Sequence, residues 1–245
     1  MYGLDLFSGI GGITKALEGY VNPVAYCENN QFAQNVLLSR QATKDLPRAP
    51  IWEDVRTLRG YMLPHIDIIY GGFPCQDISV AWHGKGLDGE RSGLFSEIVR
   101  LAGEIRPRFI FLENVRNIVN KGLKEVASEM VGLGYDCRWE ILSAAEVGAK
   151  HRRERWFMLA HSNVPGWRNG LPKENKYFTK DIKYSWKDET FNLSACRNES
   201  EYEGDPESIR MADGIPFWVD RIRALGNAVV PAQAREAFER LMGLK

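Results

Sequence analysis

One cysteine and a run of cations are the residues of this sequence that could carry out covalent chemistry. Cys75 follows the apolar segment "HIDIIY" and the residues "GGFP", so we expect Gly71 and Gly72 to let the chain turn out of the sheet and Pro74 to fix the backbone directly before the thiol. A nucleophilic cysteine needs thiolate character, and therefore nearby positive charge or hydrogen-bond donors. The segment "KHRRERWF" supplies this charge and leads into an apolar strand, so at least one arginine should point into the sheet edge. The alternatives are a small buried thiol and a solvated charged face.

Glu113 adds a candidate proton donor to this set. It ends the apolar run "FIFL", where desolvation would raise the pKa of its carboxyl and let it hold a proton near neutrality. A nucleophile, a proton donor and an arginine are the groups needed to add to an aromatic ring and stabilise the charge that develops. The sequence therefore indicates covalent catalysis rather than binding alone.

A glycine cluster and two carboxylates indicate a ligand site beside this chemistry. The glycines of "DLFSGIGG" are Gly9, Gly11 and Gly12, and glycines at a strand-to-helix turn let the backbone approach a ligand closely. Glu28 ends the second predicted strand, where a carboxylate would hold ribose hydroxyls, and Asp54 follows the short segment "IW". By itself this pattern would serve NAD or S-adenosylmethionine equally.

Strands alternate with helices through the first 160 residues, which predicts a doubly wound, mostly parallel α/β sheet. Each segment is assigned by its apolar periodicity and its flanking glycine, proline or asparagine. The predicted strands cover residues 2–7, 23–28, 51–52, 65–70, 108–115, 135–142 and 155–160, and the helices cover 11–20, 30–40, 93–105, 122–134 and 232–245. Ligands bind beyond the carboxyl ends of the strands in such a sheet, and the polar residues named above lie at those ends.

The alternation stops between residues 161 and 209, a polar region of about 49 residues with seven Lys or Arg. A structureless stretch of this length inside a domain is unusual, so the region is a small lobe, a functional insertion or a disordered loop. The sequence thus divides into residues 1–160, a catalytic and cofactor-binding domain, then 161–209, and then 210–245, which returns to the first domain.

Composition and charge exclude several classes of protein. Hydrophobic residues make up 44% and charged residues 26%, which is typical of a globular chain, and no apolar run is long enough for a membrane span. We expect no signal peptide, because "MYGLDLFSGIGG" lacks a basic start before an apolar stretch. The 32 Lys and Arg balance 32 Asp and Glu, so only a local basic patch could favour nucleic acid. The four cysteines form no CxxC pair, which predicts free thiols, a cytoplasmic location and no bound metal.

The motifs, taken in order, resemble the cytosine-C5 DNA methyltransferase family. The matching segments are "DLFSGIGG", "GGFPCQDIS", "ENV" at residues 113–115, "RRERWF" at 152–157 and "RIRALGNAVVP" at 221–231. The segment "AWHGKGLDGERSGLFSEIVR" also resembles the family's mobile loop and the helix that follows it. The resemblance spans the chain apart from residues 161–209, and it implies a Rossmann-like methyltransferase fold in which that region recognises the target.

The resemblance implies a DNA (cytosine-5-)-methyltransferase that acts on a flipped-out base in a short duplex site. Cys75 would add to C6 of cytosine, Glu113 would donate to N3, and Arg155 would contact O2 with support from Arg153. The resulting nucleophilic C5 would take the methyl group from S-adenosylmethionine, with no metal involved. Loss of the C5 proton and release of the thiol would then restore the ring.

The resemblance also implies which residues bind the cofactor and the DNA. Phe7 would lie against the adenine, Glu28 at the ribose and Asp54 at the adenine amino group. The rest of the cofactor site would comprise Asp5, Gly9, Gly11, Gly12, Pro74, Asn227 and Val229. Ser79, Arg152 and Arg153 would contact DNA. We expect a cytoplasmic monomer, in a bacterial or phage-infected cell, whose partner is double-stranded DNA, and a cognate restriction endonuclease is a candidate second partner.

The chain departs from the family pattern at three places. His151 stands where the family often has glutamine, Asn29 stands where an aromatic residue often follows the glutamate, and the recognition region is short. Several functions remain as alternatives: the same methylation on RNA, a NAD-dependent oxidoreductase, and a catalytically inactive DNA-binding protein. The oxidoreductase would leave the "PCQ", "ENV" and "RRER" motifs unused, and an inactive binding protein would need no thiol.

Overall fold

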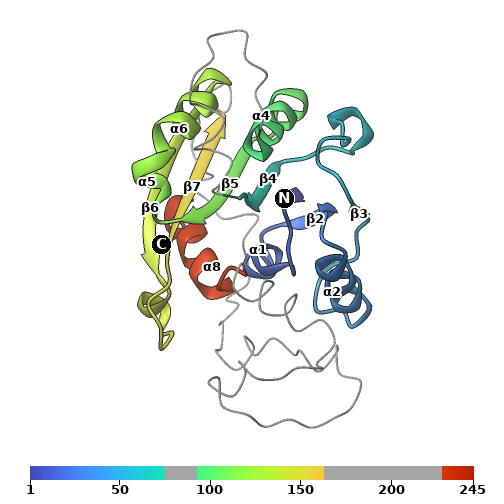
Figure 1. The fold of residues 1–245 in the computed structure, drawn as a ribbon, viewed down its shortest axis with the longest axis horizontal. Coiled ribbons are helices and arrows are strands. Elements are labelled where there is room, and N and C mark those ends of the chain that lie inside the picture. The colour runs from blue at the N-terminus through green and yellow to red at the C-terminus, as the bar shows by residue number, and fades with distance from the viewer. Residues whose placement is uncertain (75–92, 163–227) are drawn as a thin grey trace.

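A mixed β-sheet forms the centre of the computed structural model, which describes residues 1–74, 93–162 and 228–245 (Figure 1). Within these ranges seven strands pair in the order β3-β2-β1-β4-β5-β7-β6. The strands are β1 (Tyr2–Leu6), β2 (Asn22–Cys27), β3 (Ile51–Trp52), β4 (Ile68–Gly72), β5 (Phe109–Val115), β6 (Tyr135–Ser143) and β7 (Glu154–Ser162). Pairing is parallel from β3 to β5, whereas β7 is antiparallel to both β5 and β6. The predicted doubly wound, mostly parallel sheet is confirmed.

Helices cover both faces of the sheet. Those in the described ranges are α1 (Gly12–Ala16), α2 (Gln31–Ala42), α4 (Leu94–Ile105), α5 (Ile118–Lys121), α6 (Leu123–Gly132) and α8 (Pro231–Leu241), with 3₁₀ turns η1 (Gly60–Met62) and η2 (Ala144–Val147). The core on one face comes from α4, α5, α6 and the strands beneath them, and α1 and α8 contribute to a second core on the other face. No helix in these ranges is long and apolar enough to cross a membrane.

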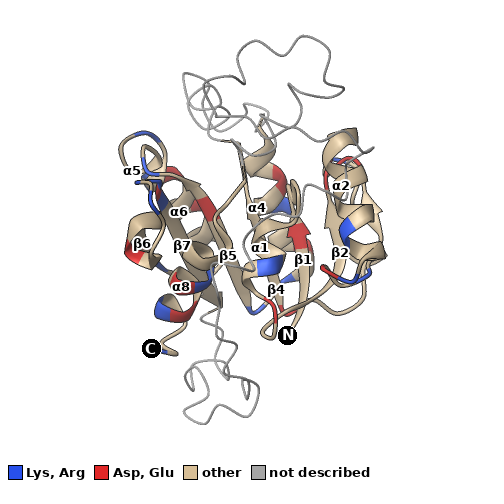
Figure 2. Ribbon diagram, turned by 90° about the horizontal axis from the view of Figure 1, so that it is seen from below, with Lys and Arg blue, Asp and Glu red and all other residues tan. Residues whose placement is uncertain are grey.

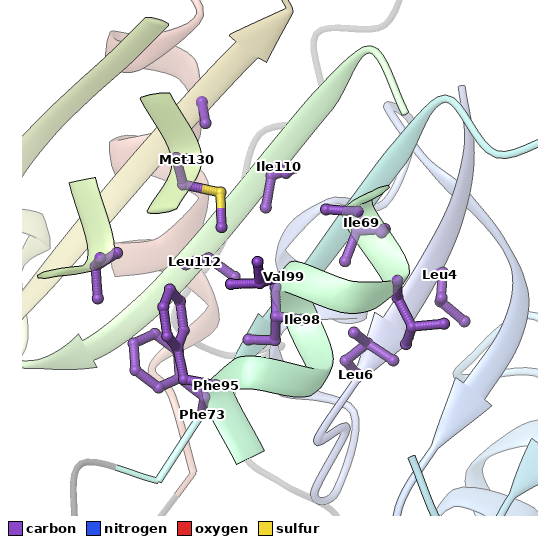
Figure 3. Packing of buried hydrophobic residues seen from close by; sticks show 14 of the residues in the cluster. Leu4, Leu6, Ile69, Phe73, Phe95, Ile98, Val99, Ile110, Leu112 and Met130 are labelled. Carbon is purple, nitrogen blue, oxygen red and sulfur yellow. The ribbon is translucent and has the colours of Figure 1, made fainter. Parts of the chain in front are cut away.

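The packing of α4 shows how the sequence pattern produces this arrangement. Its buried residues Phe95, Ile98, Val99 and Ala102 recur at the spacing of one helix face, so the helix lies flat on the sheet. Figure 3 shows this face against the apolar side chains of the neighbouring strands, Leu112 of β5 among them. The packing of α4 on the sheet fixes the position of Leu94, where the helix begins.

Element boundaries differ from the prediction at two places near the ligand edge. The strand expected over residues 65–70 is β4, Ile68–Gly72, so Gly71 and Gly72 lie within the strand. The helix expected over residues 11–20 is much shorter, Gly12–Ala16. The boundaries of the predicted recognition region and of the C-terminal unit lie mostly in residues 163–227, outside the described residues, and stay predictions. The described end of the chain, α8, packs against α1, β6 and β7.

Candidate active site

The predicted site residues that the structure describes lie at or beside one edge of the sheet. The parallel strands β1 to β5 all end there, as the sequence pattern predicted. Because β7 is antiparallel, its first residues lie at this edge instead of its last ones. This reversal brings Arg155 to the strand end that carries Glu113.

Glu113 and Arg155 form an ion pair at the centre of the edge. Arg155 Nε lies 2.8 Å from Glu113 Oε1, and the two side chains are only 15% and 12% exposed. Burial raises the pKa of the Glu113 carboxyl to about 7, although the positive charges of Arg155 and Arg153 oppose the rise. A carboxyl in this state can hold a proton near neutrality, as the sequence suggested. The strand continues past Glu113 to Val115, so the carboxyl belongs to β5 rather than to a following turn.

Two adjacent glycines of β4 make room for this arrangement. A Cβ atom on Gly71 would lie 1.9 Å from the carbonyl oxygen of Leu6, and one on Gly72 would lie 2.6 Å from Glu113 Oε2. Gly71 therefore permits the close approach of β1, and Gly72 gives space to the Glu113 carboxylate. We expected these glycines to let the chain turn out of the sheet; their place inside β4 shows that they serve close packing instead.

Asn114 holds the backbone at Phe73, two residues before Cys75. Its buried side-chain amide donates a 2.9 Å hydrogen bond to the carbonyl oxygen of Phe73, and its Oδ1 accepts from the Val115 amide. The Phe73 ring packs against Phe95 of α4, with ring centroids 5.1 Å apart. Pro74 follows and is exposed. Asn114 lies within β5 and Phe73 packs on α4, so these contacts hold the backbone in place shortly before Cys75. Cys75 and Ser79 lie outside the described residues.

Arg153 connects the edge to the C-terminal segment. Its guanidinium donates a 2.7 Å hydrogen bond to the carbonyl oxygen of Ala228. The fully buried side chain of Gln233, on α8, donates to the carbonyl oxygens of Arg153 and Leu142, each at 2.6 Å. The sequence prediction missed Gln233, and its only signal was a polar residue on the buried face of an amphipathic helix. Asn227, one residue before Ala228, lies outside the described residues.

The glycine loop after β1 takes a conformation suited to a ligand. Gly9 and Gly11 have φ values of 52° and 85°, and Phe7 also has a positive φ of 55°. A Cβ atom on Gly9 would meet nothing within 4 Å, so the loop is open at that point. Glu28 accepts from the backbone amides of Gly9 at 2.7 Å and Asn30 at 2.8 Å, which brings the predicted ribose-binding carboxylate beside the loop.

Val229 and Asp5, two other predicted cofactor residues, contact α1 at the end of the glycine loop. A Cβ atom on Gly12 would lie 2.8 Å from Val229 Cγ1, so the C-terminal segment packs directly on the start of α1. Asp5 is 1% exposed and accepts a 2.6 Å hydrogen bond from Thr14 Oγ1 on α1. Burial raises the pKa of the Asp5 carboxyl to about 8. This position favours a role for Asp5 in bracing the loop over direct contact with a ligand.

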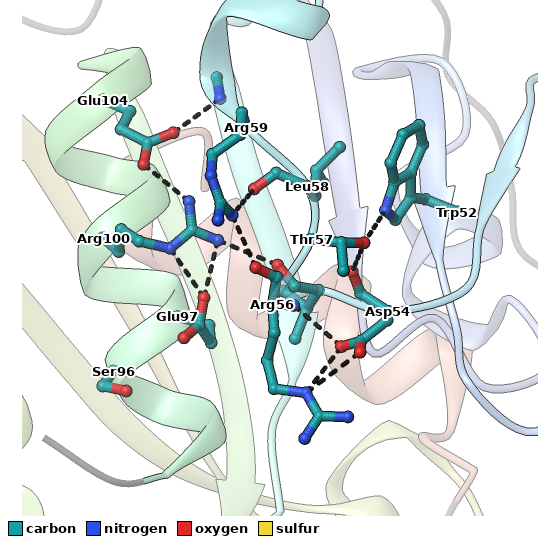
Figure 4. Close-up of polar contacts among 12 residues, drawn as sticks. Trp52, Asp54, Arg56, Thr57, Leu58, Arg59, Ser96, Glu97, Arg100 and Glu104 are labelled. Carbon is teal, nitrogen blue, oxygen red and sulfur yellow. Dashed lines mark hydrogen bonds and ion pairs between the residues drawn. The ribbon is translucent and has the colours of Figure 1, made fainter.

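Asp54 follows β3 at the same edge, within a polar network that reaches α4 (Figure 4). The Asp54 carboxylate accepts from the backbone amide and Nε of Arg56. Arg100 of α4 pairs with Glu97 and Glu104 and donates a 3.0 Å hydrogen bond to the carbonyl oxygen of Val55, which follows Asp54. The sequence analysis missed Arg100, although its i,i+3 and i,i+4 spacing from the two glutamates is a visible signal.

The described cysteines are not suited to nucleophilic catalysis. Burial raises the pKa of the Cys27 thiol to about 12 and that of the Cys137 thiol to about 11. Both are free thiols that stay protonated at neutral pH. Within the described ranges, no group of three or more His, Cys, Asp or Glu could hold a metal ion.

Comparison with known proteins identifies relatives of this chain. Residues 1–213 match the family model of the C-5 cytosine-specific DNA methylases. The chain is 32% identical, over 96% of its own length and 58% of the relative, to type II methyltransferase M.CviJI of Paramecium bursaria Chlorella virus IL3A. It is 31% identical, over 73% of its length and 55% of the relative, to type II methyltransferase M.HhaI of Haemophilus parahaemolyticus. The chain therefore spans less than two thirds of the length of these curated relatives.

A solved structure gives the same result for the fold. A DNA modification methyltransferase encoded within an E. coli prophage matches 66% of this chain and 47% of its own, with 27% identity and a TM-score of 0.54. The sequence motifs, the sheet and these matches agree.

Proposed function

Because the chain belongs to the C-5 cytosine-specific DNA methylase family, we propose that it transfers a methyl group from S-adenosylmethionine to C5 of a cytosine in duplex DNA. The observation that carries the proposal is the Glu113–Arg155 pair, because it places a carboxyl with a pKa of about 7 beside a fixed cation. Phe73, two residues before Cys75, directly follows the neighbouring strand β4 at the same edge. We therefore propose that a proton donor, an oxyanion partner and the Cys75 nucleophile act on one base.

In the proposed reaction, the Cys75 thiolate adds to C6 of the flipped-out cytosine. Glu113 donates its proton to N3 and Arg155 contacts O2, which makes C6 more electrophilic, and the addition at C6 leaves C5 nucleophilic. S-adenosylmethionine supplies the electrophilic methyl group on its sulfonium. After methylation, the C5 proton is lost to solvent, the C6–sulfur bond breaks to free the thiolate, and N3 returns its proton to Glu113, which restores the neutral aromatic ring. The high pKa values of Cys27 and Cys137 support Cys75 as the nucleophile.

The edge of β1, β2 and β3 fits the proposed cofactor. The open backbone at Gly9 leaves room for a ligand, the Glu28 carboxylate lies beside it, and the partly exposed Asp54 follows β3. We propose that Glu28 binds the ribose, Asp54 the adenine amino group and Phe7 the adenine face. Asp5, Gly12 and Val229 would hold the glycine loop in place through their contacts at α1. These assignments use side chains that the folded chain already positions, and they require no metal.

We propose that double-stranded DNA is the partner and that the protein acts as a monomer in the cytoplasm. Residues 161–209 would recognise the target, and Ser79, Arg152 and Arg153 would contact DNA. The relatives' designation as type II methyltransferases supports a cognate restriction endonuclease as a further proposed partner.

Transfer of a labelled methyl group to mixed-sequence duplex DNA tests the proposal. Cys75→Ala should abolish transfer and still bind S-adenosylhomocysteine, whereas the matched thiol variant Cys137→Ala should retain both properties. Bisulfite sequencing of DNA from expressing cells would then report the target context. Absence of transfer to any duplex DNA, or transfer to RNA of the same sequence in preference to DNA, would refute this function.

A further inference from the structure

Exposed cations gather where β5 ends and β7 begins, outside the catalytic pair. Figure 2 shows Lys and Arg in blue around α5 on this side of the sheet. We define the basic strip as Arg116, Lys121, Lys124, Lys150 and Arg152, all of which are exposed. Resting on the proposed function, we infer that the basic strip binds the phosphate backbone of duplex DNA beside the target base. The sequence analysis had assigned only Arg152 of this group to DNA.

The basic strip brings cations without an ion-pair partner together at one place. Several other cations of the described chain are paired at short range, as Arg40 is with Asp45 and Arg235 with Glu239. Within the described ranges, Lys121, Lys124, Lys150 and Arg152 have no carboxylate within ion-pair distance. Cations that stay unneutralised at one place produce a local positive potential, although the whole chain has a formal net charge of zero.

The position of the strip follows from the strand pairing. Val115 lies opposite Arg155 in the β5–β7 ladder, so Arg116 is the first residue beyond the strand that carries Glu113. Lys121 ends α5, and Lys124 lies in the first turn of α6. Lys150 and Arg152 lie shortly before β7, which begins at Glu154. The strip therefore borders the edge at which a flipped base would enter, where the backbone of its own duplex must pass.

The ion pair between Arg116 and Glu154 is weak enough for a DNA phosphate to replace Glu154. Arg116 Nη1 lies 2.6 Å from Glu154 Oε2, but the side chains are 61% and 43% exposed, so water screens the pair and it is weak. A DNA phosphate can bind the same guanidinium through two hydrogen bonds. Glu154 therefore holds Arg116 in the free protein and competes with phosphate when DNA binds. Removing the charge of Glu154 should strengthen DNA binding.

The salt dependence of binding tests the strip, because each phosphate contact contributes about 0.9 to the slope of log K against log salt. Affinity for a fluorescent mixed-sequence duplex would be measured by anisotropy between about 50 and 200 mM salt. The combined variant Arg116→Gln, Lys121→Gln, Lys124→Gln should lower the slope by about 2 to 3. Glu154→Gln should bind more tightly than the unsubstituted chain.

A matched control removes the same charge elsewhere. The exposed residues Lys44, Arg48 and Arg138 also have no ion-pair partner in the described ranges, and their triple Gln variant should leave the slope unchanged. Binding of S-adenosylhomocysteine and thermal melting verify that each variant is folded. Equal slopes for the two triple variants would overturn the inference, as would tighter binding to duplex RNA than to DNA. In that case Cys75-dependent methyl transfer would persist, whereas its loss from the unsubstituted chain would refute the proposed function itself.

Discussion

Replacement of Gly72 by alanine should separate catalysis from folding. The added Cβ atom would lie 2.6 Å from Glu113 Oε2, whereas ordinary contact begins at 3.4 Å, so the carboxylate must move by about 0.8 Å. Oε1 of the same carboxylate lies 2.8 Å from Arg155 Nε, so this movement disturbs the pair. Gly72 does not have a positive φ, so the backbone itself accepts alanine.

The expected effect is a lower turnover with modest loss of stability. Misplacement of a reacting group by about 1 Å can cost about 100-fold, so we expect kcat to fall by about 10- to 100-fold. Overpacking typically costs about 1 to 3 kcal/mol, and a carboxylate at the edge of the core can yield, so the lower end applies. For a chain of this size that corresponds to a fall in Tm of about 2 to 4 °C. Affinity for S-adenosylhomocysteine should not change.

Two other glycine substitutions serve as controls. Gly71→Ala would place its Cβ atom 1.9 Å from the Leu6 carbonyl oxygen, a backbone atom that cannot move aside, so this variant should fail to fold. Gly132→Ala, on α6, meets nothing within 4 Å and should keep full activity with equal or slightly higher stability. Methyl transfer under saturating DNA and cofactor, together with thermal melting, distinguishes these three outcomes.

A double-mutant cycle shows whether the effect of Gly72→Ala passes through Glu113. In the Glu113→Ala background the alanine at position 72 has space, so it should change the residual rate by less than about twofold. The reasoning would be wrong if Gly72→Ala retained normal turnover, or if its loss were additive with that of Glu113→Ala. An additive loss would mean that the alanine acts on the Cys75 segment, three residues further along the chain.

Three further predictions concern groups around the site. Arg100→Met removes the donor that holds the loop after Asp54, so affinity for S-adenosylhomocysteine, measured by calorimetry, should fall by about three- to tenfold with kcat unchanged. Gln233→Leu removes the two hydrogen bonds that the side-chain amide donates to the carbonyl oxygens of Leu142 and Arg153, so Tm should fall by about 4 to 8 °C in a melting experiment. Because burial raises the pKa of Glu113 to about 7, its proton is held below that pH and lost above it. Turnover should therefore decline as pH rises through 7, and this decline should be absent in Glu113→Gln.

The sequence predicted the elements and the shared edge because apolar periodicity and strand ends are local properties. It placed Glu28, Asp54 and Glu113 together for this reason, and the structure confirms their common edge. It did not show the direction of β7, because an apolar strand looks the same whichever way it pairs. That direction decides whether Arg155 reaches Glu113. The position of Cys75 itself stays a prediction, since it lies outside the described residues.

The roles of Gly71 and Gly72 show a second limit of sequence reasoning. Glycine before a proline suggests a turn, and a pattern cannot tell a residue that needs unusual dihedral angles from one that needs an empty side-chain position. In the structure both glycines need an empty side-chain position, because an oxygen atom from a neighbouring strand occupies the space that each Cβ atom would take. The partners, Leu6 and Glu113, are distant in sequence, so only the folded sheet reveals the requirement.

The C-terminal segment explains why the two halves of the site depend on each other. Val229 packs on Gly12 of the glycine loop, and one residue earlier the carbonyl oxygen of Ala228 accepts from Arg153. Gln233 then binds the carbonyl oxygen of Arg153 from α8. A short stretch of chain thus contacts both the proposed cofactor loop and β7, the strand that carries Arg155. Because these contacts are hydrogen bonds and close packing, we expect a shift on either side to displace the other. In the proposed reaction, residues 228–233 would therefore influence the distance between the cofactor and the base, although the proposed catalytic side chains come from earlier motifs.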